Sequence, residues 1–312
     1  MTCRIASASY RVAGLNFQNL RRAHGLTKAA LRNLVRQSLA SLRGQESAVR
    51  RVAIVSSPRS GNSWVRCVLA DVLGLEQIFV HNYFQAPLVL PENCILQLHW
   101  YREPNFQEFL QSNLFRVVVL ARHPLDMLLS TLHFARLDKE VNLWLGGNAE
   151  FTPSFLGAAP ASPEFLEYAT SWGAENLLSI THQWWHDQQA LKVRYEDFVR
   201  DPVSRFTELI TSLDGSPANL SAALQKYRLA KWQAKSNKHG WQGRPGLWQD
   251  LIPFEDALKI YERHRSVFDG LAYSVARTSL TREEALRNWQ QMKVDPKPTA
   301  TPQSGKAASV GK

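Results

Sequence analysis

The segment Ser57–Trp64 reads Ser-Pro-Arg-Ser-Gly-Asn-Ser-Trp and has the composition of an anion-binding turn. A short β-branched run, residues 52–55, precedes it, and apolar residues at helical spacing follow it as far as Val72. A strand that turns into a helix directs several backbone N–H groups and the positive end of the helix at one point. The sequence therefore predicts a phosphate or sulfate site at this turn.

The side chains of the turn strengthen this prediction. Gly61 lets the backbone come close to an anion, and Arg59 supplies a planar cation. The side-chain hydrogen-bond donors of the turn are Ser60, Asn62 and Ser63. Trp64 is in position to offer a ring face to a base. The alternative interpretation is an ordinary capped turn, with Arg59 in solvent and Trp64 in the core.

The turn differs from the phosphate loop of nucleoside triphosphatases, G-x-x-x-x-G-K-[ST], in which a lysine directly follows the second glycine. Here Asn62 follows Gly61, and the cation of Arg59 lies two residues before the glycine. No apolar run ends in an aspartate that is placed to hold Mg²⁺. The sequence therefore predicts phosphate binding without a metal.

A second anion position is indicated further along the chain. Arg122 follows the apolar run 115–121, which is typical of a parallel strand covered on both faces. Ser130 comes eight residues later, about two turns into the helix expected after Pro124. Both side chains can then reach one anion. Either residue alone favours a structural role, but their spacing together with the first turn favours a second phosphate.

The two motifs resemble those of the PAPS-dependent sulfotransferases, which bind the 5′-phosphosulfate and the 3′-phosphate of the sulfate donor with similar segments. The resemblance extends over residues 51–269. Val193–Asp197 is similar to the family's Y-E-D segment, whose tyrosine contacts adenine, and Gly243–Trp248 is similar to its late loop over the 3′-phosphate. Trp232 is a candidate stacking aromatic. The resemblance implies that the donor is bound by Pro58, Arg59, Ser60, Gly61, Asn62, Ser63, Trp64, Arg122, Ser130, Tyr195, Gly243 and Arg244.

His99 is the predicted catalytic base. It ends the strand expected at 94–99 and lies about as far before Arg122 as the family places its base. A neutral imidazole can take the proton of an acceptor hydroxyl, because its pKa lies near the working pH. A lone histidine at a strand end is more often structural. The position of His99 relative to the two anion motifs nevertheless favours a catalytic role. Arg59 is the second predicted catalytic residue, and weaker candidates for the base are His81, His123 and His133.

Two positions depart from the family pattern. Where the family often has K-T-H, this chain has Gln97-Leu98-His99, so a lysine is missing before the base. Where the late loop often begins R-K-G, the chain has Trp241-Gln242-Gly243. The candidates for the missing charge in the late loop are Arg244, Lys235 and Lys238.

Strands and helices alternate along the middle of the chain. The expected strands are 52–55, 94–99, 115–121 and 190–194, and the expected helical segments are 64–72, the segment after Pro124, and 163–189, with a long loop at 138–162. This alternation predicts right-handed crossovers and a parallel sheet, whose ligands bind at the carboxyl ends of the strands. We predict a single α/β domain over residues 49–293, with a central parallel β-sheet flanked by helices and a P-loop-like nucleotide-binding architecture.

The charge of the chain is concentrated at its beginning. The formal net charge is +10, yet residues 1–45 hold seven arginines, one lysine and no acidic residue. The remaining domain is close to neutral, which argues against a nucleic-acid-binding face. The leader, residues 1–48, has three interpretations: a helix docked on the domain, a basic helix making peripheral membrane contact through residues 1–45, or an organellar transit peptide. The tail, residues 294–312, has a composition typical of disorder.

Three widely spaced cysteines and the lack of a long apolar run favour a soluble protein in a reducing compartment, so we predict a cytoplasmic location. We predict a sulfotransferase that moves the sulfuryl group of PAPS to a hydroxyl, or less often an amine, of a small-molecule, lipid or carbohydrate acceptor, with no metal. Two alternatives stay open. Gln97 is compatible with a PAP- or PAPS-binding module without turnover, and the basic leader is compatible with a peripheral membrane adaptor.

Overall fold

The computed structural model describes residues 49–138, 141, 144, 147, 151–235 and 240–292, without the side chains of residues 232, 234 and 235. The predicted basic leader, residues 1–48, and the predicted tail, residues 294–312, lie outside the described residues. No helix in the described part of the chain is long and apolar enough to cross a membrane.

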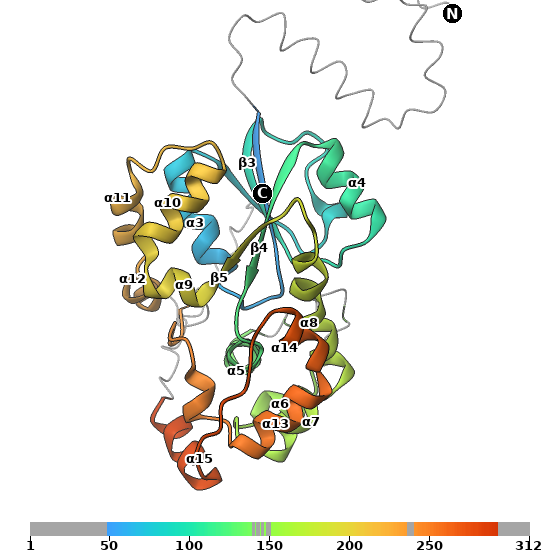
Figure 1. Cartoon of the computed structure of the whole chain (residues 1–312), viewed down its shortest axis with the longest axis vertical. Helices are drawn as coiled ribbons and strands as arrows, with labels where there is room; N and C mark the ends of the chain where they lie inside the picture. The colour runs from blue at the N-terminus through green and yellow to red at the C-terminus, as the bar shows by residue number, and fades with distance from the viewer. Residues whose placement is uncertain are drawn as a thin grey trace, which may run out of the picture. The chain divides into compact units, whose positions relative to one another are not determined.

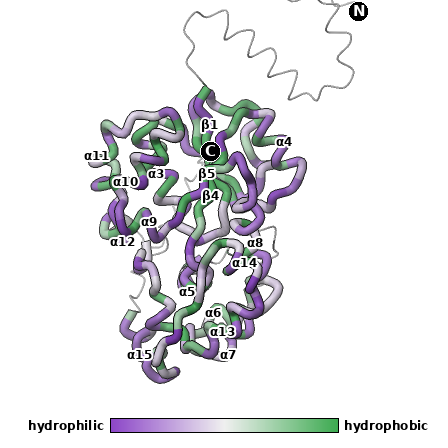
Figure 2. The backbone as a smooth tube through the Cα atoms, viewed as in Figure 1, coloured by the Kyte–Doolittle hydropathy of each residue, from purple (hydrophilic) through white to green (hydrophobic). Residues whose placement is uncertain are grey.

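Five parallel strands form one sheet in the order β2-β3-β1-β4-β5. The strands are β1 Arg50–Val55, β2 Glu76–Phe79, β3 Asn93–Leu98, β4 Phe115–Ala121 and β5 Leu191–Arg194 (Figure 1). The prediction of a central parallel sheet is therefore confirmed. Residues 52–55 of the middle strand β1 are completely buried, as a β-branched run between two layers of helices requires. Figure 2 shows the hydrophobic colour concentrated on the central strands.

Helices cover both faces of the sheet (Figure 1). The helices on one face are α3 Asn62–Leu73, α9 Tyr195–Arg200, α10 Pro202–Ser212, α11 Leu220–Lys226 and α12 Leu229–Lys235. The helices on the other face are α4 Pro104–Ser112 and α8 Trp172–Trp185. The side chains between sheet and helices form two separate apolar clusters, one for each face.

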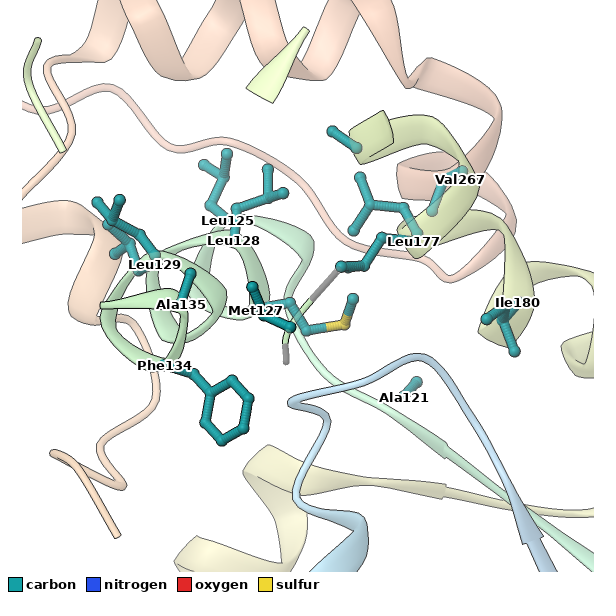
Figure 3. Close-up of a cluster of buried hydrophobic side chains, with 14 of the residues drawn as sticks. Ala121, Leu125, Met127, Leu128, Leu129, Phe134, Ala135, Leu177, Ile180 and Val267 are labelled. Atoms are coloured by element: carbon teal, nitrogen blue, oxygen red, sulfur yellow. The ribbon is translucent and has the colours of Figure 1, made fainter. Parts of the chain in front are cut away.

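A third group of helices lies beyond the carboxyl ends of the strands (Figure 1). These helices are α5 Pro124–Ala135, α6 Pro153–Gly157, α7 Pro163–Ala169, α13 Phe254–Arg263, α14 Arg265–Gly270 and α15 Arg282–Gln291, with the short 3-10 helix η3 Leu247–Asp250. A second 3-10 helix, η1 Tyr83–Gln85, packs against α4 through the ring of Tyr83, which stacks on Phe106. Every residue of α5 is buried. Figure 3 shows why: its apolar side chains pack towards Leu177 of α8 and Val267 of α14. Helix α5 is thus held rigidly at the end of the sheet where the predicted site lies.

Several predicted elements are corrected by the structure. The helical segment predicted at 163–189 is two helices, α7 and α8, because Ser171 caps the start of α8 with its side chain and the helix ends at Trp185. The segment predicted as a loop at 138–162 contains the short helix α6. Strand β2 was not expected, since its sequence Glu-Gln-Ile-Phe offers no apolar run.

Helix α3 begins and ends at glycines, as its position after the turn requires. Gly61 precedes it with φ 102° and Gly74 follows it with φ 65°, both in the left-handed region. The amide of Gly74 donates to the carbonyl of Ala70, which closes the last turn. The helix therefore starts directly at the predicted anion-binding turn.

Candidate active site

The turn after β1 is tied to the rest of the domain through Ser57. Its amide donates to Oγ1 of Thr181 on α8 at 2.8 Å, and its own Oγ accepts from the amide of Thr181 at 3.1 Å. The carbonyl of Ser57 accepts from Oγ of Ser60 at 2.9 Å and from Nδ2 of Asn62 at 3.0 Å. Two side chains predicted as donors to a ligand therefore hold the shape of the turn.

Gly61 stands where only a glycine fits. Besides its positive φ, a Cβ added to it would lie 2.6 Å from Cδ2 of Tyr195. Arg59 also has a positive φ, 66°, so the turn reverses direction within three residues. This geometry brings the start of α3 close to the tyrosine ring that follows β5.

Arg59, Arg122 and Ser130 come together although they are distant in the sequence. Nε of Arg59 donates to Oγ of Ser130 at 3.1 Å, and a terminal nitrogen of Arg122 donates to the carbonyl of Arg59 at 3.0 Å. The guanidinium of Arg59 lies 4.6 Å from the ring centroid of Phe134, and that of Arg122 lies 4.5 Å from the ring centroid of Tyr195. The two predicted anion motifs are thus parts of one site.

The electrostatics of this group fit a bound anion. Burial, together with the charge of Arg122, lowers the pKa of the Arg59 guanidinium to about 9. Nε of Arg122 is buried and has no hydrogen-bond partner among the described residues. Neighbouring cations with an unpaired buried N–H are costly alone and are stabilised by a phosphate. The residues present therefore match the 3′-phosphate group implied by the sequence.

The late loop is positioned by a residue that sequence reasoning missed. Both carboxylate oxygens of Asp126, on α5, accept backbone hydrogen bonds, from Gly246 at 2.7 Å and from Trp248 at 2.9 Å. The loop also meets the donor side of the site, because the hydroxyl of Tyr195 donates to the carbonyl of Gly243 at 2.8 Å. The only signal for Asp126 was its place four residues after Arg122, on the same face of the site.

Other residues named from the sequence lie in less direct positions. Arg244 forms an ion pair with Asp250, and half of its side chain is exposed. Trp64 packs edge to face with three aromatic rings, which are Tyr195, Phe198 and Phe206. That packing matches the alternative interpretation of Trp64 as part of the core. The side chains of Trp232 and Lys235, and the whole of Lys238, lie outside the described residues.

His99 directly follows β3 and turns towards the anion-binding turn. Its Nδ1 lies 2.7 Å from the carbonyl of Ser56, which can only accept, so Nδ1 carries the proton and Nε2 keeps its lone pair. Burial lowers the pKa of His99 to about 4, and the charges of His81, Arg59 and Arg66 contribute, while the bond to Ser56 opposes the shift. The imidazole is therefore neutral at physiological pH and has the tautomer of a base.

Two of the weaker histidine candidates are used in packing. In His123, Nδ1 accepts from the amide of Leu125 and Nε2 donates to the carbonyl of Ser274 at 3.1 Å, so both ring nitrogens are engaged. The ring of His133 stacks on Trp241 with centroids 4.6 Å apart. These contacts commit His123 and His133 to packing, whereas His99 faces the turn through its bond to Ser56.

Four aromatic residues near α5 and α6 belong to the apolar core and do not line an open pocket. Phe134, Phe151 and Phe155 are buried, and Trp144 stacks on Phe134 with centroids 4.7 Å apart. In the described part of the chain, no group of three or more His, Cys, Asp or Glu side chains could hold a metal ion. The prediction that the reaction needs no metal stays a prediction.

The parallel sheet, with two connected anion positions and a histidine at the carboxyl ends of its strands, defines a nucleotide-binding α/β protein. Residues 50–239 match the family model of the sulfotransferase domain. The chain therefore belongs to the sulfotransferase domain family, and the prediction of a PAPS-dependent sulfotransferase is confirmed.

Solved structures share this fold. The crystal structure of mouse sulfotransferase SULT7A1 complexed with PAP has a TM-score of 0.53 at 14% identity and covers 78% of this chain and 91% of that chain. The crystal structure of retinol dehydratase in a complex with retinol and PAP has a TM-score of 0.50 at 15% identity. The match covers 75% of this chain and 83% of that chain. A comparison with curated protein sequences gives no match.

Proposed function

We propose that the chain transfers the sulfuryl group of PAPS to a hydroxyl of a small-molecule acceptor, with His99 as the base. The observation that carries this assignment is the hydrogen bond from Nδ1 of His99 to the carbonyl of Ser56. It fixes the tautomer in which Nε2 can take a proton, and it places the ring at the edge of the anion-binding turn.

The protein would hold PAPS at its two anionic groups, the 3′-phosphate and the 5′-phosphosulfate. Arg122 and Ser130 are the candidates for the 3′-phosphate, because Arg122 has a buried N–H without a partner. The backbone of residues 58–62 and the start of α3 are the candidates for the 5′-phosphosulfate. Tyr195 lies between the two, with its ring against Gly61 and beneath Arg122. When bound, the donor supplies an electrophilic sulfur and PAP as the leaving group.

In the proposed reaction the acceptor oxygen bonds to sulfur in line with the bond that breaks. His99 takes the hydroxyl proton on Nε2 as this happens. Arg59 and the backbone N–H groups of the turn stabilise the charge that remains on the bridging oxygen. Because Arg59 donates to Ser130, its guanidinium lies between the two proposed anion positions and is held in place before the donor binds.

A small-molecule acceptor is supported by one of the structural neighbours, which was crystallised with retinol as well as PAP. Lipid and carbohydrate acceptors, and an amine in place of the hydroxyl, stay predictions. A cytoplasmic location also stays a prediction.

Labelled PAPS and a broad panel of hydroxyl compounds test the proposal. Wild-type protein should transfer label to at least one compound, and His99→Ala should lower the rate about 100-fold or more while PAP affinity stays unchanged. His186→Ala is the matched control, because the exposed His186 directly follows the last residue of α8, and this variant should keep full activity. Full activity of His99→Ala would remove His99 from the mechanism, and tight PAP binding without any transfer would favour a binding module.

A further inference from the structure

A cluster of one arginine and two histidines surrounds the ring of Phe79 at the carboxyl end of β2. The guanidinium of Arg66 lies 5.8 Å from the centroid of this ring. The imidazoles of His81 and His99 lie at centroid distances of 5.5 Å and 6.4 Å. Phe79 is 49% exposed, so the cluster opens to solvent beside the proposed base.

Arg66 is the fixed charge of this cluster. It lies one turn into α3, and its Nε is buried without a hydrogen-bond partner among the described residues. Electrostatic interactions with Arg66 and His81 reach His99, and both lower the pKa of that imidazole. An arginine N–H that is buried and unpaired next to a solvent-exposed ring is suited to a ligand with hydrogen-bond acceptors.

The cluster lies on the opposite side of His99 from the proposed nucleotide site. In the sheet order, β2 and β3 lie on one side of β1, whereas β4 and β5, which carry Arg122 and Tyr195 at their ends, lie on the other. Three strand spacings separate the ends of β2 and β4, or roughly 14 Å. The acceptor must reach Nε2 of His99 from the side that the nucleotide leaves open, which is the side of Phe79.

Strand β3 itself brings no charge to the cluster, because Gln97 occupies the position beside Phe79. Gln97 pairs with Phe79 in the register of β2 and β3, and its buried Oε1 has no hydrogen-bond partner among the described residues. A neutral amide therefore occupies the strand position next to the cluster. Arg66 brings a positive charge to the same region from the helix instead.

We propose that Arg66, His81 and Phe79 form an acceptor subsite that binds an anionic group of the acceptor, such as a carboxylate, sulfate or phosphate, next to its reacting hydroxyl. Phe79 offers an apolar surface to the body of the acceptor, and Arg66 offers the charge-assisted hydrogen bonds. The inference rests on the proposed role of His99 and names the class of acceptor: a small hydroxyl compound that is negatively charged.

Matched pairs of compounds test the subsite in the full-length protein saturated with PAP. Suitable pairs are 6-hydroxy-2-naphthoate with 2-naphthol, and 4-(hydroxymethyl)benzoate with benzyl alcohol. Calorimetric titration should show the carboxylate of at least one pair binding about tenfold more tightly than its neutral partner. Arg66→Gln should abolish this preference, whereas Arg66→Lys, which keeps the charge, should retain most of it.

Arg205→Gln is the control, because it removes one charge from the exposed face of α10 and should leave the preference intact. The inference is overturned if wild-type protein shows no preference in either pair, or if Arg66→Gln retains it. Arg66→Gln could also lose affinity equally for both compounds of a pair and for PAP, without recovery in Arg66→Lys. That result would show a structural role for Arg66 and would also overturn the inference. PAP binding and sulfate transfer to neutral alcohols test the proposed function separately.

Discussion

At the scale of single residues, His99 is set up as a base by one hydrogen bond and by its neighbours. The carbonyl of Ser56 determines which nitrogen carries the proton. Burial is the main cause that lowers the pKa of the ring to about 4, and electrostatic interactions with His81, Arg59 and Arg66 act in the same direction. Protonation removes the base, so a lowered pKa extends the active range towards acid.

The pH profile of the reaction should show this shift. We expect kcat/KM to fall on the acid side with an inflection well below 6.5, the ordinary value, because kcat/KM reports the enzyme before it binds its substrates. Initial rates at subsaturating acceptor across the acid range measure it. An acid limb centred at or above 6.5 would show that His99 is not the titrating base.

Gly61 is required both by its positive φ and by the close approach of the Tyr195 ring. Comparison with Gly74, which has only the positive φ, distinguishes the two effects. Gly61→Ala should cost about 2 kcal/mol or more of unfolding free energy and weaken PAP binding, because the new Cβ meets the Tyr195 ring at a positive φ. Gly74→Ala has the same left-handed backbone but nothing within 4 Å, so it should cost only about 1 kcal/mol. Urea unfolding and PAP titration of both variants measure the difference. Equal effects would rule out the steric contribution of Tyr195.

At the scale of elements, α5 joins the two halves of the donor site. Ser130 on this helix accepts from Arg59 of the first turn, and Asp126 one turn earlier holds the late loop through Gly246 and Trp248. Since α5 is buried along its whole length, both contacts are made from a rigid support. Removing either contact should therefore change the conformation of the loop that it holds and leave α5 unchanged.

Asp126→Ala should loosen the late loop. Asp126 is 1% exposed, and its removal leaves two backbone N–H groups without acceptors, which should cost roughly 3 kcal/mol of unfolding free energy. The amides of Gly246 and Trp248 should exchange with solvent faster, while those of α5 stay protected. Hydrogen exchange read by mass spectrometry measures this. Unchanged protection of the loop would mean that Asp126 does not anchor it.

At the scale of the whole molecule, three histidines link stability to pH: His123 and His264 are buried, and His99 is partly buried. Burial lowers the pKa of His99, His123 and His264 in the folded state below the unfolded value of 6.5. Between the folded and unfolded values the unfolded chain binds more protons, so this contribution to stability is present above 6.5 and is lost as the pH falls.

The melting temperature should follow that sign. Lowering the pH from 7.5 to 5 should reduce the melting temperature by about 5 °C or more, since each 1 kcal/mol corresponds to a few degrees in a domain of this size. Differential scanning calorimetry in buffers of equal ionic strength measures it. His123→Gln should make the dependence shallower, and a melting temperature that rises towards acid would contradict the assignment of neutral buried histidines.

The sequence by itself determined the elements that have a local signal. The apolar runs at 52–55, 94–99 and 115–121 became strands, because a strand buried on both faces needs a nearly continuous apolar sequence. The predicted strand at 190–194 became the edge strand β5, which is only partly buried. Gly74 ended its helix as expected, since a left-handed residue is needed there. Strand β2 was missed because its outer residues Glu76 and Gln77 are exposed at the edge of the sheet and have no apolar period.

Tertiary structure alone decided which side chains meet. The pattern Arg122 to Ser130 could be read from spacing, yet its contact with Arg59 depends on strands that are neighbours in space. The position of Asp126 four residues after Arg122 did not reveal its role, because its partners lie 120 and 122 residues away in the chain. Arg66 looked like an ordinary helical residue until β2 placed Phe79 beside it. The physical reason is that periodicity reports only local burial, whereas a binding site is made where several strands end together.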